Sequence, residues 1–190
     1  MHSNNDRSLT EALRIQLVNV ARRTIKVGLG KDHIVIHLAD YPEQLRERRA
    51  SFVTLYRNGK LRGCIGTLEP NRSLVEDIAH NAYQAAFSDP RFMPLTAAEF
   101  DSVDIHLSVL SLLQPLVFNS EPELLMQLRP RIDGLVLIEG RLRSTFLPAV
   151  WEQLPEPQLF FSELKRKAGL PTDYWSDTVT VQRYTVETIP

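Results

Sequence analysis

Alternating apolar and polar positions predict several strands in this chain. The clearest example is residues 103–109, where apolar side chains at every second position alternate with polar ones that include His106 and Ser108. A period of two is typical of a strand with one buried face. Weaker apolar patterns predict a short strand at residues 34–38 and a closing strand at residues 179–189.

Two hairpins are predicted from turns that contain glycine. The first spans residues 52–66 and turns at Asn58-Gly59, between two runs rich in strand-forming residues. Asn-Gly is the strongest short-range signal for a hairpin, because a type I′ turn needs positive φ at both central positions. The second hairpin is expected at residues 135–146, around Glu139-Gly140.

A two-residue turn fixes the expected register of the first hairpin. It places Cys64 opposite Val53 and Arg62 opposite Leu55, so that these four side chains share one sheet face. The other face is more apolar, and we expect it to form the main core with Phe52, Tyr56, Leu61 and Ile65. Cys64 is then expected to line a cleft beside that core.

Helices are predicted where capping boxes precede apolar residues at helical spacing. Ser8, Ser73 and Thr96 are each followed three residues later by Glu, the pattern that satisfies the first N–H groups of a helix. The first helix is expected to run to about Val27, and Asp89-Pro90 ends the second. Three short helices are also expected, at residues 121–128 and beginning at Pro148 and at Pro157.

This order of elements favours an α+β fold with mixed, mainly antiparallel sheets and packed helices, because hairpins outnumber βαβ units. A chain of 190 residues is long enough to bury a substantial core. The polar residues 1–7 are expected to form a disordered leader. Residues 8–190 are expected to form a single domain, because no linker-like segment interrupts them.

Composition excludes several classes of partner. The 22 basic and 23 acidic residues nearly cancel, so no general affinity for nucleic acid or an anionic membrane is expected. No apolar run approaches the roughly 18 residues that span a bilayer. The N-terminus lacks the apolar segment of a signal peptide, and one cysteine cannot form an internal disulfide. We therefore expect a cytoplasmic protein.

Motifs for common cofactors are missing from the sequence. The five histidines and one cysteine form neither an HExxH pattern nor a paired-cysteine pattern, and no glycine-rich nucleotide-binding loop occurs. We therefore expect no metal site and no cofactor.

The segment Arg62-Gly63-Cys64-Ile65-Gly66 is the strongest candidate for chemistry. Two glycines in a strand indicate a bulge, or a close approach by a ligand or by other backbone. A guanidinium near a thiol lowers the thiol pKa and favours the nucleophilic thiolate. The alternative is that Cys64 is a small buried apolar residue and that Gly63 and Gly66 merely bend the sheet.

Four other residues are candidate binding residues. Asp89 and Arg91 follow the second predicted helix, where they either display an acid and a guanidinium at a cleft or form a structural ion pair that fixes a turn. His106 and Ser108 share the polar face of their strand. Either could line a pocket, although a solvated face also explains both.

Several motifs together resemble one family. The segments are Phe52-Val-Thr-Leu55, Leu61-Arg-Gly-Cys-Ile-Gly66, Ala85-Ala-Phe87, Asp89-Pro-Arg-Phe92, Leu107-Ser-Val-Leu110, Asp133-Gly134, Phe146-Leu-Pro148, Val150-Trp151 and Lys167-Ala-Gly-Leu170. With these segments, the sequence is similar to the AMMECR-type domain family, also called AmmeMemoRadiSam system protein A, over nearly all of its length after residue 8. The resemblance implies two unequal, interleaved subdomains around antiparallel sheets, and it makes the Cys64 segment the signature site of the family. It also suggests a Memo-like protein and a radical-SAM protein as partners.

The resemblance supplies no established reaction, so two functions stay open. In the first, the protein is an enzyme or an enzyme-system component in which Cys64 is a nucleophile or transient covalent carrier, helped by Arg62. Asp89 and Arg91 would then shape the substrate pocket. In the second, the protein is a non-catalytic module that binds a small anion through Arg62 and Arg91, or binds a partner, while Cys64 only packs.

Overall fold

The structure is a computed structural model that describes residues 8–190, and its two four-stranded sheets with packed helices confirm the predicted α+β class. The expected leader, residues 1–7, lies outside the described residues. The chain divides into two compact units. Unit 1 runs to Leu110 and resumes at Glu187–Pro190, and unit 2 is Ser111–Val186. The smaller unit is thus inserted into the sequence of the larger one, as the resemblance implied.

The sheet of unit 1 has the strand order β2-β1-β3-β8. Strand β1 is Ser51–Arg57, β2 is Lys60–Gly66, β3 is Val103–Leu110 and β8 is Val186–Ile189. Strand β1 pairs antiparallel with both β2 and β3, so β2 is an edge strand. The Asn58-Gly59 turn and the strand at residues 103–109 were both predicted correctly.

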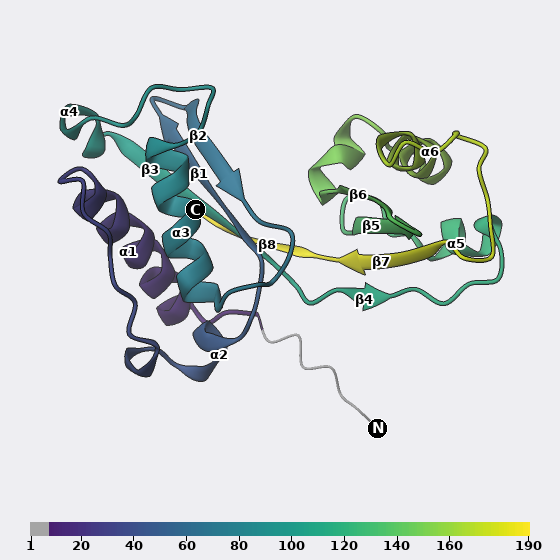
Figure 1. The fold of residues 1–190 in the computed structure, drawn as a ribbon, viewed down its shortest axis with the longest axis horizontal. Helices are drawn as coiled ribbons and strands as arrows, with labels where there is room; N and C mark the ends of the chain where they lie inside the picture. The colour runs from purple at the N-terminus through teal and green to yellow at the C-terminus, as the bar shows by residue number, and fades with distance from the viewer. Residues whose placement is uncertain (1–7) are drawn as a thin grey trace. The chain divides into compact units, whose positions relative to one another are not determined.

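Two helices cover one face of this sheet. Helices α1 (Glu11–Gly28) and α3 (Leu74–Phe87) lie side by side and contact the strands (Figure 1). Short elements complete the unit: η1 (Leu38–Asp40), α2 (Glu43–Arg46) and α4 (Ala97–Phe100). The core contains fully buried side chains from both layers, among them Leu17, Ile25, Val53, Leu55, Ile78 and Leu107.

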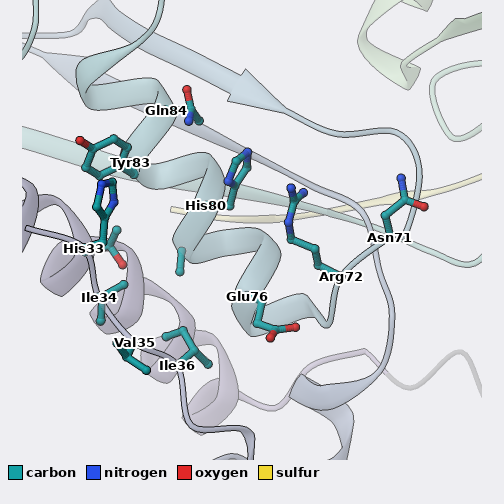
Figure 2. A pocket seen from close by; sticks show the side chains of 12 residues that line it. His33, Ile34, Val35, Ile36, Asn71, Arg72, Glu76, His80, Tyr83 and Gln84 are labelled. Carbon is teal, nitrogen blue, oxygen red and sulfur yellow. The ribbon is translucent and has the colours of Figure 1, made fainter.

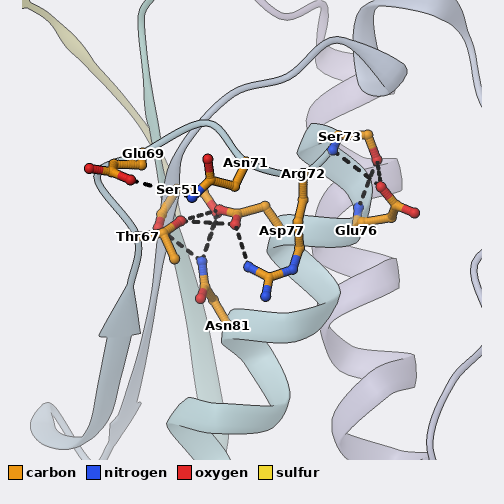
Figure 3. A network of polar contacts seen from close by, with 9 residues as sticks. All are labelled: Ser51, Thr67, Glu69, Asn71, Arg72, Ser73, Glu76, Asp77 and Asn81. Carbon is orange, nitrogen blue, oxygen red and sulfur yellow. Dashed lines mark hydrogen bonds and ion pairs between the residues drawn. The ribbon is translucent and has the colours of Figure 1, made fainter.

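A buried polar network fastens α3 to the sheet. The Asp77 carboxylate is 1% exposed and accepts hydrogen bonds from Ser51 Oγ at 2.6 Å, Thr67 Oγ1 at 2.8 Å and Asn81 Nδ2 at 2.9 Å (Figure 3). Ser51 begins β1, and Thr67 follows β2. A buried carboxylate is stable only when it is well hydrogen-bonded, so this network holds α3 in one position against both strands.

Two local predictions in unit 1 were wrong. Helix α1 begins after Thr10, whose side chain accepts from the Leu13 N–H, and not after Ser8. The N–H of Leu9 instead donates to Glu187 Oε2 at 3.2 Å, which keeps that residue out of the helix. No strand forms at residues 34–38, because residues 34–37 are irregular and Leu38 begins η1. Ile34 and Ile36 still pack against the core, whereas Val35 between them is 70% exposed, so the apolar pattern marked an inward face without a strand.

Unit 2 has a second sheet and its own core. The strand order is β4-β7-β5-β6, and Gly140 takes φ +57° in the turn of the predicted second hairpin. Trp151 stacks on Phe160 at 3.8 Å between ring centroids, and both side chains are fully buried. The elements are β4 (Gln114–Pro115), α5 (Glu121–Gln127), β5 (Gly134–Glu139), β6 (Leu142–Phe146), η2 (Pro148–Glu152), α6 (Pro157–Lys167) and β7 (Thr180–Tyr184).

We expect residues 8–190 to unfold in a single calorimetric transition, as one domain. The chain enters unit 2 directly after β3 and leaves it at Val186, the first residue of β8, so no segment of its own separates the two units in sequence. Where the chain crosses, the Ser111 N–H donates to the Thr185 carbonyl and the Thr185 N–H donates to Ser111 Oγ, both at 2.9 Å. Two resolved transitions would show that the units unfold independently.

Candidate functional site around Cys64

A β-bulge reverses the face on which Cys64 lies. Arg57 pairs with Lys60 as predicted, but the register shifts between Leu55 and Tyr56, because Arg62 has no partner on β1. Cys64 therefore pairs with Thr54, and not with Val53. Side chains alternate along a strand, so one extra residue moves every later side chain to the opposite face.

The core face of β1 is the opposite of the one predicted, although Ile65, which pairs with Val53, packs against the core as expected. Val53 and Leu55 are fully buried beneath the helices, whereas Phe52 and Tyr56 are half-buried on the other face and Leu61 is 40% exposed. Cys64 shares the face of Thr54, away from α1 and α3, and its free thiol is half-buried. The prediction of the β2 register failed because it assumed an unbroken ladder, and the prediction for β1 failed because the more apolar side chains do not face the helices.

The two glycines beside Cys64 meet different neighbours. A Cβ built on Gly63 would lie far inside van der Waals contact with the backbone carbonyl of Ala85 on α3. A Cβ on Gly66 would overlap the ring of Phe52, its partner on β1. Gly63 therefore allows the close approach of α3, and Gly66 accommodates an aromatic ring on the outer face.

Asp89 and Arg91 hold the peptide groups of Cys64. The Cys64 N–H donates to Asp89 Oδ2 at 2.9 Å, and Arg91 Nη2 donates to the Cys64 carbonyl at 3.1 Å. On an edge strand these outward-facing groups have no neighbouring strand to bond. The two side chains take the place of that strand at this one residue. We call this arrangement the Asp89–Arg91 clamp.

The clamp is itself a tight ion pair. Arg91 donates to Asp89 from Nε at 3.0 Å and from Nη2 at 2.7 Å, and the Asp89 side chain is only 2% exposed. The Arg91 hydrogen bond, aided by the Cys64 N–H, holds the pKa of Asp89 well below its ordinary value, although burial acts in the opposite direction. Asp89 is thus a carboxylate at neutral pH, directly behind Cys64.

Arg62 is directed away from the thiol. Its guanidinium donates to Glu99 Oε1 at 2.9 Å, to Glu99 Oε2 at 3.1 Å and to the Met93 carbonyl at 3.0 Å. The Arg62 hydrogen bond lowers the pKa of Glu99 to about 2. The Arg62 and Arg91 guanidiniums lie 5.9 Å and 5.5 Å from the centroid of the Phe92 ring. Arg91, and not Arg62, is therefore the guanidinium that bonds Cys64.

The outer face places a row of polar side chains beside the thiol. Thr54 Oγ1 lies 3.2 Å from Cys64 Sγ, and Thr54 pairs in turn with His106 on β3. Adjacent strands lie about 4.8 Å apart, so His106 is about 10 Å from Cys64 and outside hydrogen-bond reach. His106 packs edge-on against Tyr56 at 5.0 Å between ring centroids, and Ser108 pairs with Phe52 on the same face.

Of the candidates from sequence, Asp89 and Arg91 bond Cys64 directly, while His106 and Ser108 share its sheet face. Thr54 and Glu99 were missed. Thr54 could have been found by assigning the bulge to the segment containing Gly63, but no local signal paired Glu99 with Arg62.

Among residues 8–190, no group of three or more His, Cys, Asp or Glu side chains could hold a metal ion. No helix in the same range is long and apolar enough to cross a membrane.

Comparison with known proteins gives consistent matches. A model of the AMMECR1 family matches residues 18–189. A protein of Methanothermobacter thermautotrophicus is 36% identical over 165 residues, covering 86% of each chain. A protein of Thermotoga maritima is 40% identical over 150 residues, covering 77% of this chain and 80% of its own.

A solved structure matches as well. The crystal structure of an uncharacterized protein from Pyrococcus horikoshii has a TM-score of 0.78 and 31% identity, and the match covers 95% of this chain and 92% of that one. The names of these three relatives state no activity. On this agreement of sequence and fold, the chain belongs to the AMMECR1 family.

Proposed function

We propose that the protein is an enzyme, or a component of an enzyme system, in which the Cys64 thiol reacts with the substrate. We further propose that it acts in the cytoplasm with a Memo-like protein and a radical-SAM protein. The partners rest on the family resemblance, and the role of Cys64 rests on its surroundings.

One observation carries the proposal: a half-buried free thiol lies off the core, and its peptide groups are fixed on both sides by the Asp89–Arg91 clamp. A purely structural cysteine fills space in a core, which this one does not. Reactive groups work best when surrounding contacts fix their position before the substrate binds. The clamp supplies that rigidity at an edge strand, which would otherwise be free to move.

The proposal assigns distinct roles to the neighbouring residues. Thr54 Oγ1 is close enough to donate a hydrogen bond to a thiolate at Cys64, which would stabilise the nucleophilic form. Asp89 and Arg91 act as positioning residues through the peptide groups. His106 is too far to remove the thiol proton directly, so we assign that step to a group on the substrate or on a partner.

The alternative, a module that binds a small anion through Arg62 and Arg91, has less support. Arg62 donates to both oxygens of Glu99, and Arg91 donates to both oxygens of Asp89. A bound anion would have to compete with these carboxylates for the same donors. Arg91 is 53% exposed and could still offer one face to a ligand.

We expect Cys64 to react with iodoacetamide in the folded protein. Because Cys64 is the sole cysteine, the labelled mass reports on this residue alone. Thr54→Val should slow the reaction about tenfold at neutral pH, because it removes a hydrogen bond to the thiolate. Labelling rates measured by mass spectrometry over a range of pH would separate a change in thiol pKa from a change in access.

The matched control is Thr188→Val, which removes an exposed threonine hydroxyl from β8 of the same sheet. Its labelling rate should equal that of the wild type. Complete protection of Cys64 in the native protein, with full labelling in urea, would contradict the proposal. In cells that contain the partners, a covalent adduct on wild-type Cys64 that is absent from Cys64→Ser would support it directly.

A further inference from the structure

A polar cavity lies in the helical layer of unit 1, away from Cys64. Its volume is about 570 Å³, and it is bounded by α3, by the irregular segment at residues 33–36 and by Asn71 and Arg72 ahead of α3 (Figure 2). This volume lies within the range of small-molecule sites. Cys64 and its clamp residues are not part of its lining.

The cavity is lined by hydrogen-bonding groups that the fold does not use. Within residues 8–190, the side chains of His80, Gln84 and Tyr83 have no hydrogen-bond partner, and His33 makes only a ring contact with Tyr83 at 4.6 Å between centroids. These side chains come from α3 and from the segment opposite it, and they surround one space (Figure 2). Convergent, unpaired polar groups in a cavity are typical of a ligand site.

Arg72 is the strongest charge in the cavity, and it is only loosely paired. Its Nη1 lies 3.8 Å from Asp77 Oδ1, and its side chain is 41% exposed. The Asp77 carboxylate is already satisfied by three shorter hydrogen bonds from Ser51, Thr67 and Asn81 (Figure 3). The Arg72 guanidinium therefore keeps donors free for another acceptor.

His80 lies close enough to Arg72 for their charges to interact. Burial is the main cause of the lowered pKa of His80, and the Arg72 charge lowers it further, while Asp77 raises it. An imidazole and a guanidinium placed together repel when both are charged, and an anion between them would remove that repulsion. The acid in the lining, Glu76, bonds instead to the backbone N–H and hydroxyl of Ser73.

We propose that this cavity binds a small molecule through an oxyanion, a carboxylate or a phosphate group, held between Arg72 and His80. Gln84 donates an additional hydrogen bond, and the ring pair of His33 and Tyr83 flanks the rest of the ligand. This site is separate from the chemistry proposed for Cys64 and does not depend on it.

The test uses the full chain and follows the imidazole resonances of its histidines by NMR. Inorganic sulfate serves as the first probe, because its charge does not change in the range where imidazoles titrate. We expect a saturable shift of the His80 resonance, with little change at His106 on the opposite face of the sheet. Equal or non-saturating shifts at both histidines would overturn the proposal.

Two variants and one control locate the site. Arg72→Gln should weaken sulfate binding about tenfold, because it removes a charge-assisted contact. His80→Gln should abolish the pH dependence of binding and keep the fold, because His80 has no partner to lose. Arg141→Gln removes an exposed guanidinium in unit 2 and should leave binding unchanged. Equal affinity in wild type and Arg72→Gln would overturn the proposal.

The direction of the pH effect follows from His80. Its pKa in the free protein is below the ordinary 6.5, with Arg72, Asp77, Glu76 and His33 as the neighbouring ionisable groups. A bound anion raises this pKa. The affinity for sulfate should therefore increase as the pH falls from the pKa of His80 in the sulfate complex to its pKa in the free protein. Affinity independent of pH would contradict the role of His80. Separate titrations with succinate and inorganic phosphate would show which oxyanion is preferred.

Discussion

Alanine at Gly63 is expected to lower the free energy of unfolding by about 3 kcal/mol, the upper part of the usual range for overpacking. The new methyl group would meet the Ala85 carbonyl of α3 well inside van der Waals contact. Backbone on both sides of the clash leaves no side chain that could rotate away. Either α3 or β2 must shift, and both are fixed by the buried network around Asp77.

Gly66→Ala is the matched comparison on the same strand. Its Cβ would overlap the ring of Phe52, a half-buried side chain on the outer face and not backbone. We therefore expect a loss of about 1 kcal/mol. Urea unfolding of both variants, followed by circular dichroism, measures the difference. Equal losses would mean that α3 can move away from β2, and that the close approach at Gly63 is not a constraint of the fold.

Local signals were sufficient for most elements of this chain. The Asn58-Gly59 turn, the Ser73 capping box and the alternation at residues 103–109 each depend on interactions within a few residues, and each was predicted correctly. Thr10 caps the first helix in place of Ser8, and the Leu9 N–H between them donates to Glu187, 178 residues away in the sequence. That contact is set by the tertiary fold and has no local signature.

The candidate site depended on a detail that periodicity does not reveal. One unpaired residue, Arg62, changed the partner of Cys64 from Val53 to Thr54 and so placed the thiol on the face of Phe52 and Tyr56. The glycine at position 63 had indicated a bulge or a close approach, and the structure contains both. The same bulge turns Arg62 toward Glu99, so the basic residue nearest to Cys64 in sequence does not bond it.

Removing Asp89 is expected to cost about 3 kcal/mol of stability, the scale of breaking a buried ion pair. Asp89→Ala leaves the Cys64 N–H and the Arg91 guanidinium without their acceptor. Because Arg91 is 53% exposed, water can solvate its charge and keep the loss at the lower end for such pairs. Ser88→Ala, next to it and exposed, is the control and should change stability by less than about 0.5 kcal/mol.

The same variant separates the positioning role of the clamp from its contribution to stability. The pKa of Asp89 is lowered in the folded protein, mainly by Arg91, from an ordinary value of 3.8. The stability that the Asp89 carboxylate contributes is therefore complete at neutral pH. It is lost as the pH falls from the ordinary pKa of 3.8 toward the lower pKa of Asp89 in the folded protein. The stability difference between wild type and Asp89→Ala should shrink over the same acidic range.

At neutral pH, where Asp89→Ala remains folded, iodoacetamide should label Cys64 faster than in wild type, because the edge strand is no longer held. An unchanged labelling rate, together with the expected loss of stability, would show that the clamp stabilises the fold without positioning the thiol.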